Sequence, residues 1–399
     1  MKQITEYTDF INIIRCLLQN QSDLYIESSS ELDWDSIFEE FRNHSLTTLA
    51  IDSIEKMNIP IRVLQPWKEE IFKQSSHFVK LLHVQEKISD CLNSENINWV
   101  ILKGSSAALY YQNPYQRTIG DIDILVSEND FERAKKCLSN FGFAFGNNIY
   151  KYDRHQTARK DGIEIELHRF FAETRDSGND NALNNLLFDS LSNYHIKKIN
   201  NTPFNTLPIL EEGLVFIEHI WHHIRTGIGL RQILDFIMYT DKVLNDNFWH
   251  NSFMQVSQDF GYETLCKVVA RTGQMYFGLD NSIMWCKDID DNLCTEFLEM
   301  ILNQGNFGEK TSLQFNPTIR VLNKKNEGIA SFLKYEQASG MKNWKAAQKH
   351  NILEPLAWIY GIGRHIVKTL SNKTNILRLK SNYIQSIKES ILINKLKKK

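Results

Sequence analysis

The sequence has little proline and glycine, no paired cysteine motif and no long apolar run. Only 7 prolines and 18 glycines occur among 399 residues, against 23 Phe, 14 Tyr and 8 Trp, which favours a helix-rich fold with an aromatic core. No uncharged apolar run approaches the roughly 18 residues that would span a bilayer, and the polar start of the chain lacks a signal peptide's apolar stretch. Hydrophobic residues at 42% and charged residues at 24% exclude a disordered or collagen-like chain. We therefore expect a globular, cytoplasmic protein.

The six cysteines are scattered along the chain without a C-x-x-C pair: Cys16, Cys91, Cys137, Cys266, Cys286 and Cys294. Thiolate zinc sites usually need ligands at short, paired spacing. The pattern predicts buried thiols in a reducing compartment, not a disulfide framework or a zinc site.

The formal net charge of −2 hides a basic C-terminal segment. From Arg364 to Lys399 there are ten basic residues and one acid, Glu389. Apolar residues are interleaved with these charges: Ile384, Ile387, Ile391, Leu392 and Leu396. Such a segment suits peripheral contact with an anionic membrane or polyanion, but a solvated terminal helix is the favoured interpretation.

Hydrophobic periodicity divides the chain into helical and mixed parts. The apolar spacing of Trp34, Ile37 and Phe41 is typical of an amphipathic helix, as is that of Trp67, Ile71 and Phe78. Short strands are predicted at 98–102, 121–126, 150–160 and 162–170, the last two joined by a turn at Asp161-Gly162. Helical periodicity returns from Glu211.

These patterns predict an α+β fold, with a small mixed β-sheet flanked by helical regions on both sides in the sequence. We expect an N-terminal helical region at 1–96, an α/β core at 97–205, a helical domain at 206–325 and C-terminal helices with the basic tail at 326–399.

The most informative motif is the pair Asp121 and Asp123 on a predicted strand. Alternate strand residues share a face, so the two carboxylates project together. Side by side they repel one another unless a cation lies between them. Because hard oxygen ligands suit Mg²⁺, which also binds substrate phosphates, the pair indicates a magnesium site; a solvated strand end is the alternative.

Two further features strengthen this interpretation. Gly104-Ser105 follows a strand and opens a predicted helix, where backbone N–H groups attract phosphate. Glu166 and His168 share one face of a later predicted strand, and Glu166 supplies the third carboxylate that a two-metal site needs. A phosphate cradle, paired acids and a third acid fit phosphoryl or nucleotidyl transfer.

The run from Lys103-Gly104-Ser105 through Asp121-Ile122-Asp123, followed by Glu166-Leu167-His168, resembles the polymerase-β-like nucleotidyltransferase superfamily. More narrowly, it resembles the bacterial "uncharacterised nucleotidyltransferase" family, whose members often lie beside surface-polysaccharide genes. The resemblance covers roughly residues 30 to 310. It implies two Mg²⁺ ions (Mn²⁺ is an alternative) and transfer of a nucleoside monophosphate from an NTP to a hydroxyl, phosphate or amine acceptor.

Carried over, Asp121, Asp123 and Glu166 are the metal ligands, and Gly104 and Ser105 form the triphosphate cradle. The third acid is more often Asp in such proteins, so the longer Glu166 must fold back to place its oxygen. Three further residues are candidates because of their positions. Lys103 and Arg117 could neutralise the charge of the phosphate groups, and His168 could bond to a metal-bound Glu166.

A later helical stretch offers candidates for the acceptor side. His219 and His223 are four residues apart on one helix face; without a glutamate in the H-E-x-x-H position, lining of the acceptor cleft is favoured over a metal site. Arg231 and Asp235 have the spacing of a helix ion pair or of an active-site wall.

Two other classes of function remain open. A catalytically silent binding or regulatory module on the same fold is the main alternative to an enzyme. A nucleic-acid polymerase ranks lower, because no basic stripe with interleaved aromatics occurs outside the C-terminal tail. NTP and an unknown small-molecule or protein acceptor are the expected partners.

Overall fold

The computed structural model describes the chain at residues 2–20, 32–146, 154–172, 178–224, 227–306 and 310, then at 337, 340–341, 343–344, 346, 351–371, 388–389 and 391–396. The chain forms two compact units, Met1–Lys310 with Lys397–Lys399, and Thr311–Leu396. The predicted site lies entirely in the first unit. The second contains η11 (Asn351–Leu356) and α16 (Ala357–Ser371). Most of the predicted basic segment lies outside the described residues.

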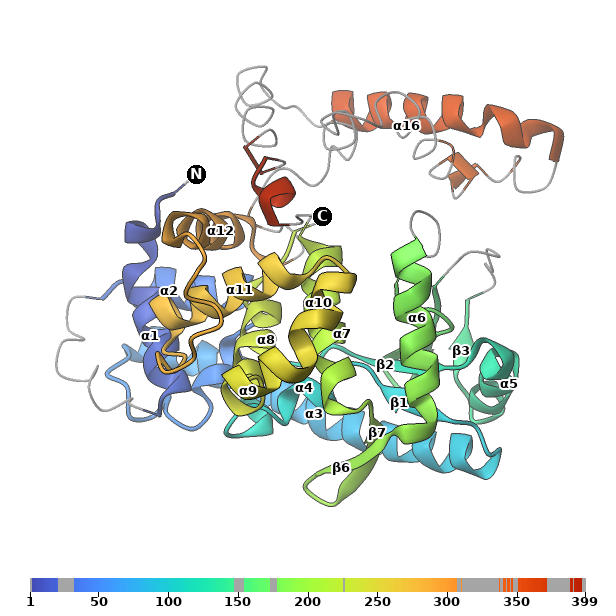
Figure 1. Cartoon of the computed structure of the whole chain (residues 1–399), viewed down its shortest axis with the longest axis horizontal. Helices are drawn as coiled ribbons and strands as arrows, with labels where there is room; N and C mark the ends of the chain where they lie inside the picture. The colour runs from blue at the N-terminus through green and yellow to red at the C-terminus, as the bar shows by residue number, and fades with distance from the viewer. Residues whose placement is uncertain are drawn as a thin grey trace. The chain divides into compact units, whose positions relative to one another are not determined.

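The first unit contains a seven-stranded mixed sheet with the strand order β3-β4-β5-β2-β1-β7-β6, which lies on the right-hand side of the view in Figure 1. Its strands are β1 (Trp99–Ile101), β2 (Asp121–Val126), β3 (Ala144–Phe145), β4 (His155–Lys160), β5 (Ile163–His168), β6 (His195–Ile199) and β7 (Thr202–Thr206). β2 runs parallel to β5 and β1 parallel to β7, whereas the other neighbours are antiparallel. The predicted α+β class with a mixed sheet is thereby confirmed.

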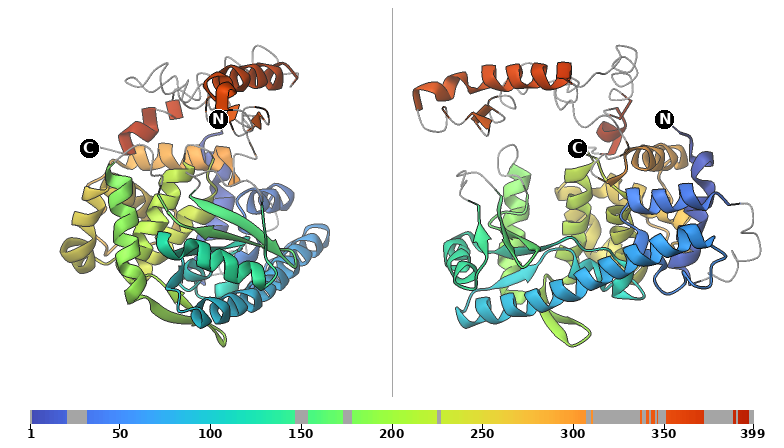
Figure 2. Two further views of the ribbon diagram at one scale, coloured as in Figure 1. Left: turned by 90° about the vertical axis from the view of Figure 1, so that its right-hand side faces the viewer. Right: turned by 180° about the vertical axis from the view of Figure 1, so that it is seen from behind.

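Helices cover one face of this sheet through an apolar layer. α3 (Ile61–Ser94) is a 34-residue helix that runs along the sheet (Figure 2), and α5 (Phe131–Asn140) lies beside it. Ile122 and Ile124 of β2 pack into one buried cluster with residues of α3 and α5. Because side chains alternate along β2, Asp121 and Asp123 lie on the opposite face.

The β4–β5 hairpin forms where the sequence predicts it. Asp161 and Gly162 have positive φ angles of 52° and 80°, as a two-residue type I′ turn requires. The turn places His155 directly opposite His168 and Thr157 opposite Glu166. This register brings a histidine of β4 next to the predicted third acid.

The remaining described helices of the first unit lie before, between and after the strands in sequence. They are η1 (Ile4–Tyr7), α1 (Thr8–Leu18), α2 (Trp34–Asn43), η4 (Thr47–Ala50), α4 (Ser105–Ala108), η5 (Pro114–Gln116), η6 (Glu128–Asp130), α6 (Gly178–Ser190), η7 (Leu191–Asn193), α7 (Ile209–His223), α8 (Leu230–Lys242), α9 (Asp246–Phe248), η8 (Trp249–Phe253), α10 (Met254–Asp259), α11 (Glu263–Thr272), η9 (Gly273–Phe277) and α12 (Asp291–Gln304). The predicted helical faces are buried at Trp34, Phe41, Trp67 and Phe78. No helix in the described part is both long and apolar enough to cross a bilayer.

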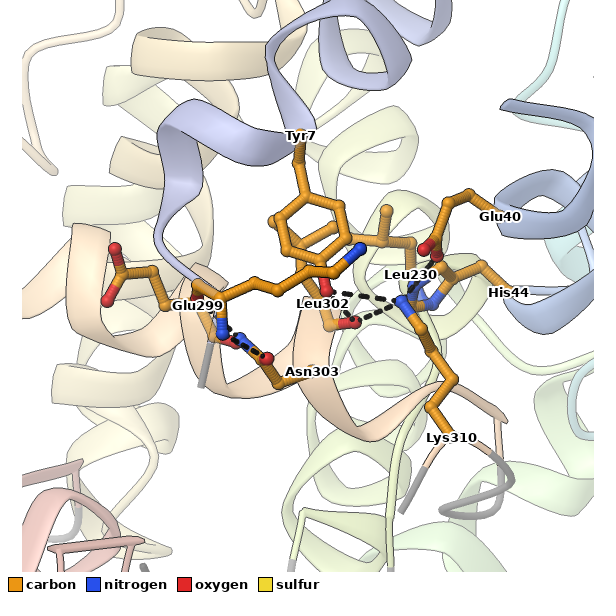
Figure 3. A network of polar contacts seen from close by, with 9 residues as sticks. Tyr7, Glu40, His44, Leu230, Glu299, Leu302, Asn303 and Lys310 are labelled. Atoms are coloured by element: carbon orange, nitrogen blue, oxygen red, sulfur yellow. Dashed lines mark hydrogen bonds and ion pairs between the residues drawn. The ribbon is translucent and has the colours of Figure 1, made fainter. Parts of the chain in front are cut away.

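A polar network joins the start of the chain to the end of the first unit (Figure 3). Lys310 donates to the carbonyl of Leu302 at 2.7 Å and also pairs with Glu40 of α2. The ring of His44 is fully buried, and its Nδ1 accepts from the backbone N–H of Leu230 at 3.3 Å. These contacts tie α2, α8 and α12 together around one buried imidazole.

The cysteine prediction is wrong for one pair. Cys91 of α3 and Cys137 of α5 form a disulfide, with their Cα atoms 6.4 Å apart. The sequence gives no sign of it, because the two residues are 46 positions apart and meet only through helix packing. The other four cysteines are free, as predicted, and three of them are buried.

Candidate metal and nucleotide site

The three predicted acids meet at the edge shared by β2 and β5. The parallel register pairs Asp121 with Glu164 and Asp123 with Glu166. One carboxylate oxygen from each of Asp121, Asp123 and Glu166 lies within 4.8 Å of the others. The strand alternation inferred from sequence thus gives one convergent cluster of carboxylates.

The pKa values of the two aspartates are shifted in opposite directions. The charge of Asp123, followed by burial, raises the pKa of Asp121 to about 6. Burial also acts to raise the pKa of Asp123, but the charges and hydrogen bonds of Lys103 and His168 outweigh it and hold that pKa below its usual range. Asp123 is therefore the anionic centre of the cluster at neutral pH.

Lys103 reaches into the acid cluster from the end of β1. Its Nζ lies 3.0 Å from Oδ1 of Asp123. Sequence analysis assigned Lys103 to phosphate; the structure shows that its ammonium group neutralises part of the acid charge when no other cation is bound.

Two histidines hold the carboxylate of Glu166. His155 Nε2 lies 3.3 Å from Oε1, and His168 Nε2 lies 3.3 Å from Oε2. His168 Nε2 also lies 3.1 Å from Oδ1 of Asp123, as expected for a histidine beside the third acid. Glu166 has a longer side chain than the aspartate that is more common at this position, and the contacts with His155 and His168 hold its carboxylate near Asp123.

His155 was missed by sequence reasoning. Its position depends on the β4–β5 pairing, which sets it opposite His168. A two-residue turn at Asp161-Gly162 fixes which residues of the two strands lie opposite one another. Counting equal numbers of residues away from this turn would have placed His155 opposite His168.

The donor set fits a hard divalent cation. Oδ2 of Asp123 is buried and has no hydrogen-bond partner among the described residues. A buried carboxylate oxygen without a partner is costly, and a cation shared with Asp121 and Glu166 would satisfy it. Carboxylate oxygens are the ligands that Mg²⁺ prefers, so the three acids suit the ion that the sequence predicts.

The Gly104-Ser105 turn has the required backbone conformation but a different side-chain arrangement. Gly104 has φ +64° and ψ −107°, a conformation open to glycine alone. The Ser105 hydroxyl donates to Gln85 of α3 at 2.8 Å, so a contact of this hydroxyl with phosphate would require that bond to be exchanged. The predicted helix that Gly104-Ser105 opens is only the single turn α4, so its dipole adds little attraction for phosphate.

The two arginine candidates differ in what they contact. Arg117 forms a bidentate ion pair with Asp235, with Nε–Oδ1 and Nη2–Oδ2 distances of 2.7 Å. Tyr111 donates to the same carboxylate at 3.0 Å. Asp235 therefore pairs with Arg117 and not with Arg231, contrary to the predicted helix ion pair, because the loop before β2 brings Arg117 onto α8.

Arg231 is left with fewer partners than Arg117. Its Nη1 donates to the carbonyl of Thr118 at 3.0 Å, while its buried Nε has no hydrogen-bond partner in the described part of the chain. Asp123 and burial raise the pKa of Asp121, and the charge of Arg231 is among the smaller effects that oppose them. This is the arrangement of a cation that an anionic ligand would satisfy.

Three histidines at the end of α7 lie near the same cluster. The rings of His219 and His223 are 4.6 Å apart and perpendicular, and Arg154 donates to Nε2 of His222 at 3.0 Å. Burial, aided by the charge of Lys103, lowers the pKa of His219 well below its usual value, and burial first among several causes lowers that of His223 to about 4. At neutral pH these imidazoles are uncharged and can exchange hydrogen bonds with a polar ligand.

Comparison with known proteins identifies the family. The model of the family described as "Uncharacterised nucleotidyltransferase" matches residues 30–277, and the chain belongs to this family. It is also similar to the crystal structure of an antigenic nucleotidyltransferase-like protein from Paracoccidioides brasiliensis, at 16% identity and a TM-score of 0.31, over 45% of this chain and 85% of that chain. No curated protein matches the chain. The family predicted from the motifs is confirmed, and membership supports a general nucleotidyltransferase role.

Proposed function

We propose that the protein is a Mg²⁺-dependent nucleotidyltransferase that moves a nucleoside monophosphate from an NTP to a hydroxyl, phosphate or amine acceptor. The observation that carries this proposal is the convergence of Asp121, Asp123 and Glu166 within 4.8 Å, with one oxygen of Asp123 buried and unpartnered. The reaction forms a bond from the acceptor oxygen or nitrogen to the α-phosphorus and breaks the bond to the leaving pyrophosphate.

The three acids would hold two divalent ions, which would neutralise triphosphate charge and activate the acceptor group. Glu166, whose two oxygens are oriented by His155 and His168, accepts the proton that the acceptor loses. The neutral histidines His219 and His223 line the acceptor side and offer hydrogen bonds without adding charge.

The side chains that we propose to bind phosphate differ from those predicted from the sequence. Arg117 is held by both oxygens of Asp235, so its role is to fix the loop before β2. Arg231, whose Nε lacks a partner in the described structure, takes the phosphate role that sequence analysis gave to Arg117. Lys103 would be available to the triphosphate if divalent ions balanced the charge of Asp123 in its place.

A catalytically silent binding module is the second candidate, and one observation favours it. The Lys103 ammonium group already lies 3.0 Å from Asp123, where it balances charge that a metal would otherwise balance. If this pair is permanent, the fold binds a partner without needing a divalent ion. A role in surface-polysaccharide biosynthesis stays a prediction of the family resemblance, and the low rank of a nucleic-acid polymerase stays a prediction from the absence of a basic stripe with interleaved aromatics.

The direct test is incubation of the protein with each α-labelled NTP, Mg²⁺ and a cell extract. We expect label to appear in one acceptor with wild-type protein and to be lost with Asp123→Asn. The matched control is Glu128→Gln, an exposed acid just after β2, which should transfer label like wild type. Transfer that survives in Asp123→Asn would refute the proposed mechanism.

A further inference from the structure

A second group of possible metal ligands adjoins the three acids and shares Glu166 with them. His155, Glu166 and His168 each offer one ligand atom within 4.8 Å of the others. His155 and His168 are register partners on antiparallel strands, so their side chains project from the same face as Glu166. The strands themselves, rather than a loop, set this arrangement.

We propose that His155, Glu166 and His168 form a mixed imidazole–carboxylate site that binds a transition-metal ion such as Mn²⁺, Co²⁺ or Zn²⁺ in preference to Mg²⁺. The site deepens the proposed function by assigning different ions to the two metal positions. Its existence does not depend on nucleotide transfer, because the ligands are preorganised without a nucleotide.

The spacing of the donor atoms suits one ion. The two histidine Nε2 atoms lie 3.3 Å from opposite oxygens of Glu166. Ligand atoms on a single ion with bonds near 2.1 Å are about 3 to 4 Å apart. An ion placed between these groups would replace the contacts that the imidazoles now make with Glu166, and that His168 makes with Asp123 at 3.1 Å.

Both rings can present a lone pair at Nε2. The Nδ1 atoms of His155 and His168 are buried and have no hydrogen-bond partner among the described residues. No donor group occupies either Nδ1, so each ring can keep its proton there and, once His168 gives up the Nε2 proton that it donates to the carboxylates, turn the Nε2 lone pair toward a metal. His168 is only 4% exposed, which shields its ring nitrogens from competing water.

Ligand chemistry then separates the two metal positions. The Asp121 and Asp123 side offers oxygen atoms, which suit Mg²⁺ and its bound waters. The histidine side offers two nitrogens and one carboxylate, a set that favours Mn²⁺, Co²⁺ and Zn²⁺ over Mg²⁺. Glu166 is common to both groups of ligands.

Co²⁺ binding to the untagged, full-length protein tests this proposal without nucleotide. Nitrogen ligation gives Co²⁺ visible absorption bands that differ from those of the aqueous ion. We expect such bands in the wild-type protein, also when Mg²⁺ is in excess. In His155→Gln the Co²⁺ affinity should fall by roughly 10- to 100-fold or more, because even the loss of a side chain that only supports a metal ligand costs that much. Displacement of all bound Co²⁺ by Mg²⁺ would overturn the proposed selectivity.

Two control variants locate the bands. His83→Gln removes an exposed histidine of α3 that pairs with Glu86, and it should bind Co²⁺ like wild type. His219→Gln tests the α7 histidines as the source of the bands. Unchanged Co²⁺ affinity in His155→Gln, or bands that vanish only in His219→Gln, would overturn the site. Because no NTP is present, a failed transfer assay leaves this result unaffected, and a failed Co²⁺ titration leaves the transfer assay valid.

Discussion

At the scale of single residues, the behaviour of Lys103 separates the two proposed functions, the enzyme and the catalytically silent binding module. Its ammonium group lies 3.0 Å from Asp123, and the charges of Asp123, Asp121 and Glu166 together raise its pKa against the opposing effect of burial. It therefore stays charged and competes with any divalent ion for the same oxygens.

Replacing this lysine tests the competition. In Lys103→Met, we expect Mg²⁺ affinity without nucleotide to rise on the order of tenfold, equivalent to removing roughly 1.4 kcal/mol of repulsion. NTP affinity should fall, since a phosphate partner is lost. Isothermal titration measures both, with the exposed Lys80→Met as control. Unchanged or weaker Mg²⁺ binding in Lys103→Met would show that the lysine does not occupy a metal position.

The two arginines should respond in opposite ways to substitution. Asp235→Asn leaves the buried Arg117 without its carboxylate, and we expect a loss of about 3–5 kcal/mol in the free energy of unfolding. Arg231→Met removes one hydrogen bond to a carbonyl, so its stability cost should be near 1 kcal/mol, but NTP affinity should fall at least about tenfold. Urea unfolding and nucleotide titration separate these effects. Equal loss of NTP affinity in Asp235→Asn with little loss of stability would reverse the assigned roles.

At the scale of elements, the site depends on the turn between β1 and α4. Gly104 has φ +64°, and an added Cβ would meet Ile119 Cγ2 at 3.4 Å, an ordinary contact. The cost of a side chain there is thus backbone strain and not a clash.

Gly104→Ala is expected to lower the free energy of unfolding by about 1–2 kcal/mol or more. It should also weaken Mg²⁺-dependent NTP binding, because Lys103 and Ser105 flank the turn. Gly120→Ala is the matched control, since no atom lies within 4 Å of its added Cβ and its φ is not positive. Thermal or urea unfolding measures the stability of both variants. Equal stability of Gly104→Ala and Gly120→Ala would contradict the expected backbone strain at Gly104.

The buried His44 network makes stability depend on pH (Figure 3). Burial, with a further contribution from the charge of Lys310, lowers the pKa of His44 to about 3. Below pH 6.5 His44 binds a proton in the unfolded chain, whereas in the folded protein it stays neutral until about pH 3. The free energy of unfolding therefore falls as pH decreases through this window. The loss approaches about 1.4 kcal/mol per pH unit.

The variant His44→Asn keeps an acceptor for the Leu230 N–H but does not titrate. We expect its stability to fall less steeply than that of wild type between pH 6.5 and 4.5, measured by urea unfolding at matched pH values. Parallel pH curves for the two proteins would show that His44 is not the titrating group.

Local patterns predicted elements well and long-range pairings poorly. β2 begins and ends where the apolar alternation of 121–126 predicted, and the Asp161-Gly162 turn fixed the hairpin. β6 and β7 were not predicted, because β6 is a polar edge strand with mostly exposed residues. The Arg117–Asp235 pair joins residues 118 positions apart, and nothing in either local sequence specifies that partner.

At the scale of the whole molecule, the site joins residues from separate parts of the chain. β1, β2, β4 and β5 supply Lys103, the acids and the histidines, and α7 and α8 supply the remaining polar groups. The sheet could be inferred from periodicity, but the approach of α7 and α8 to the acids depends on packing of helices after residue 206. That is why the carboxylate cluster was predicted from sequence and the pairing of Arg117 with Asp235, on which the proposed role of Arg231 depends, was not.

The central claim is that three converging carboxylates bind divalent ions and, through them, an NTP. Equilibrium binding of a fluorescent NTP to wild type, Asp123→Asn and Glu128→Gln, each with Mg²⁺ and with EDTA, tests this claim most directly. We predict Mg²⁺-dependent binding in wild type and Glu128→Gln and its loss in Asp123→Asn. NTP binding that is indifferent to Mg²⁺, or retained in Asp123→Asn, would contradict it.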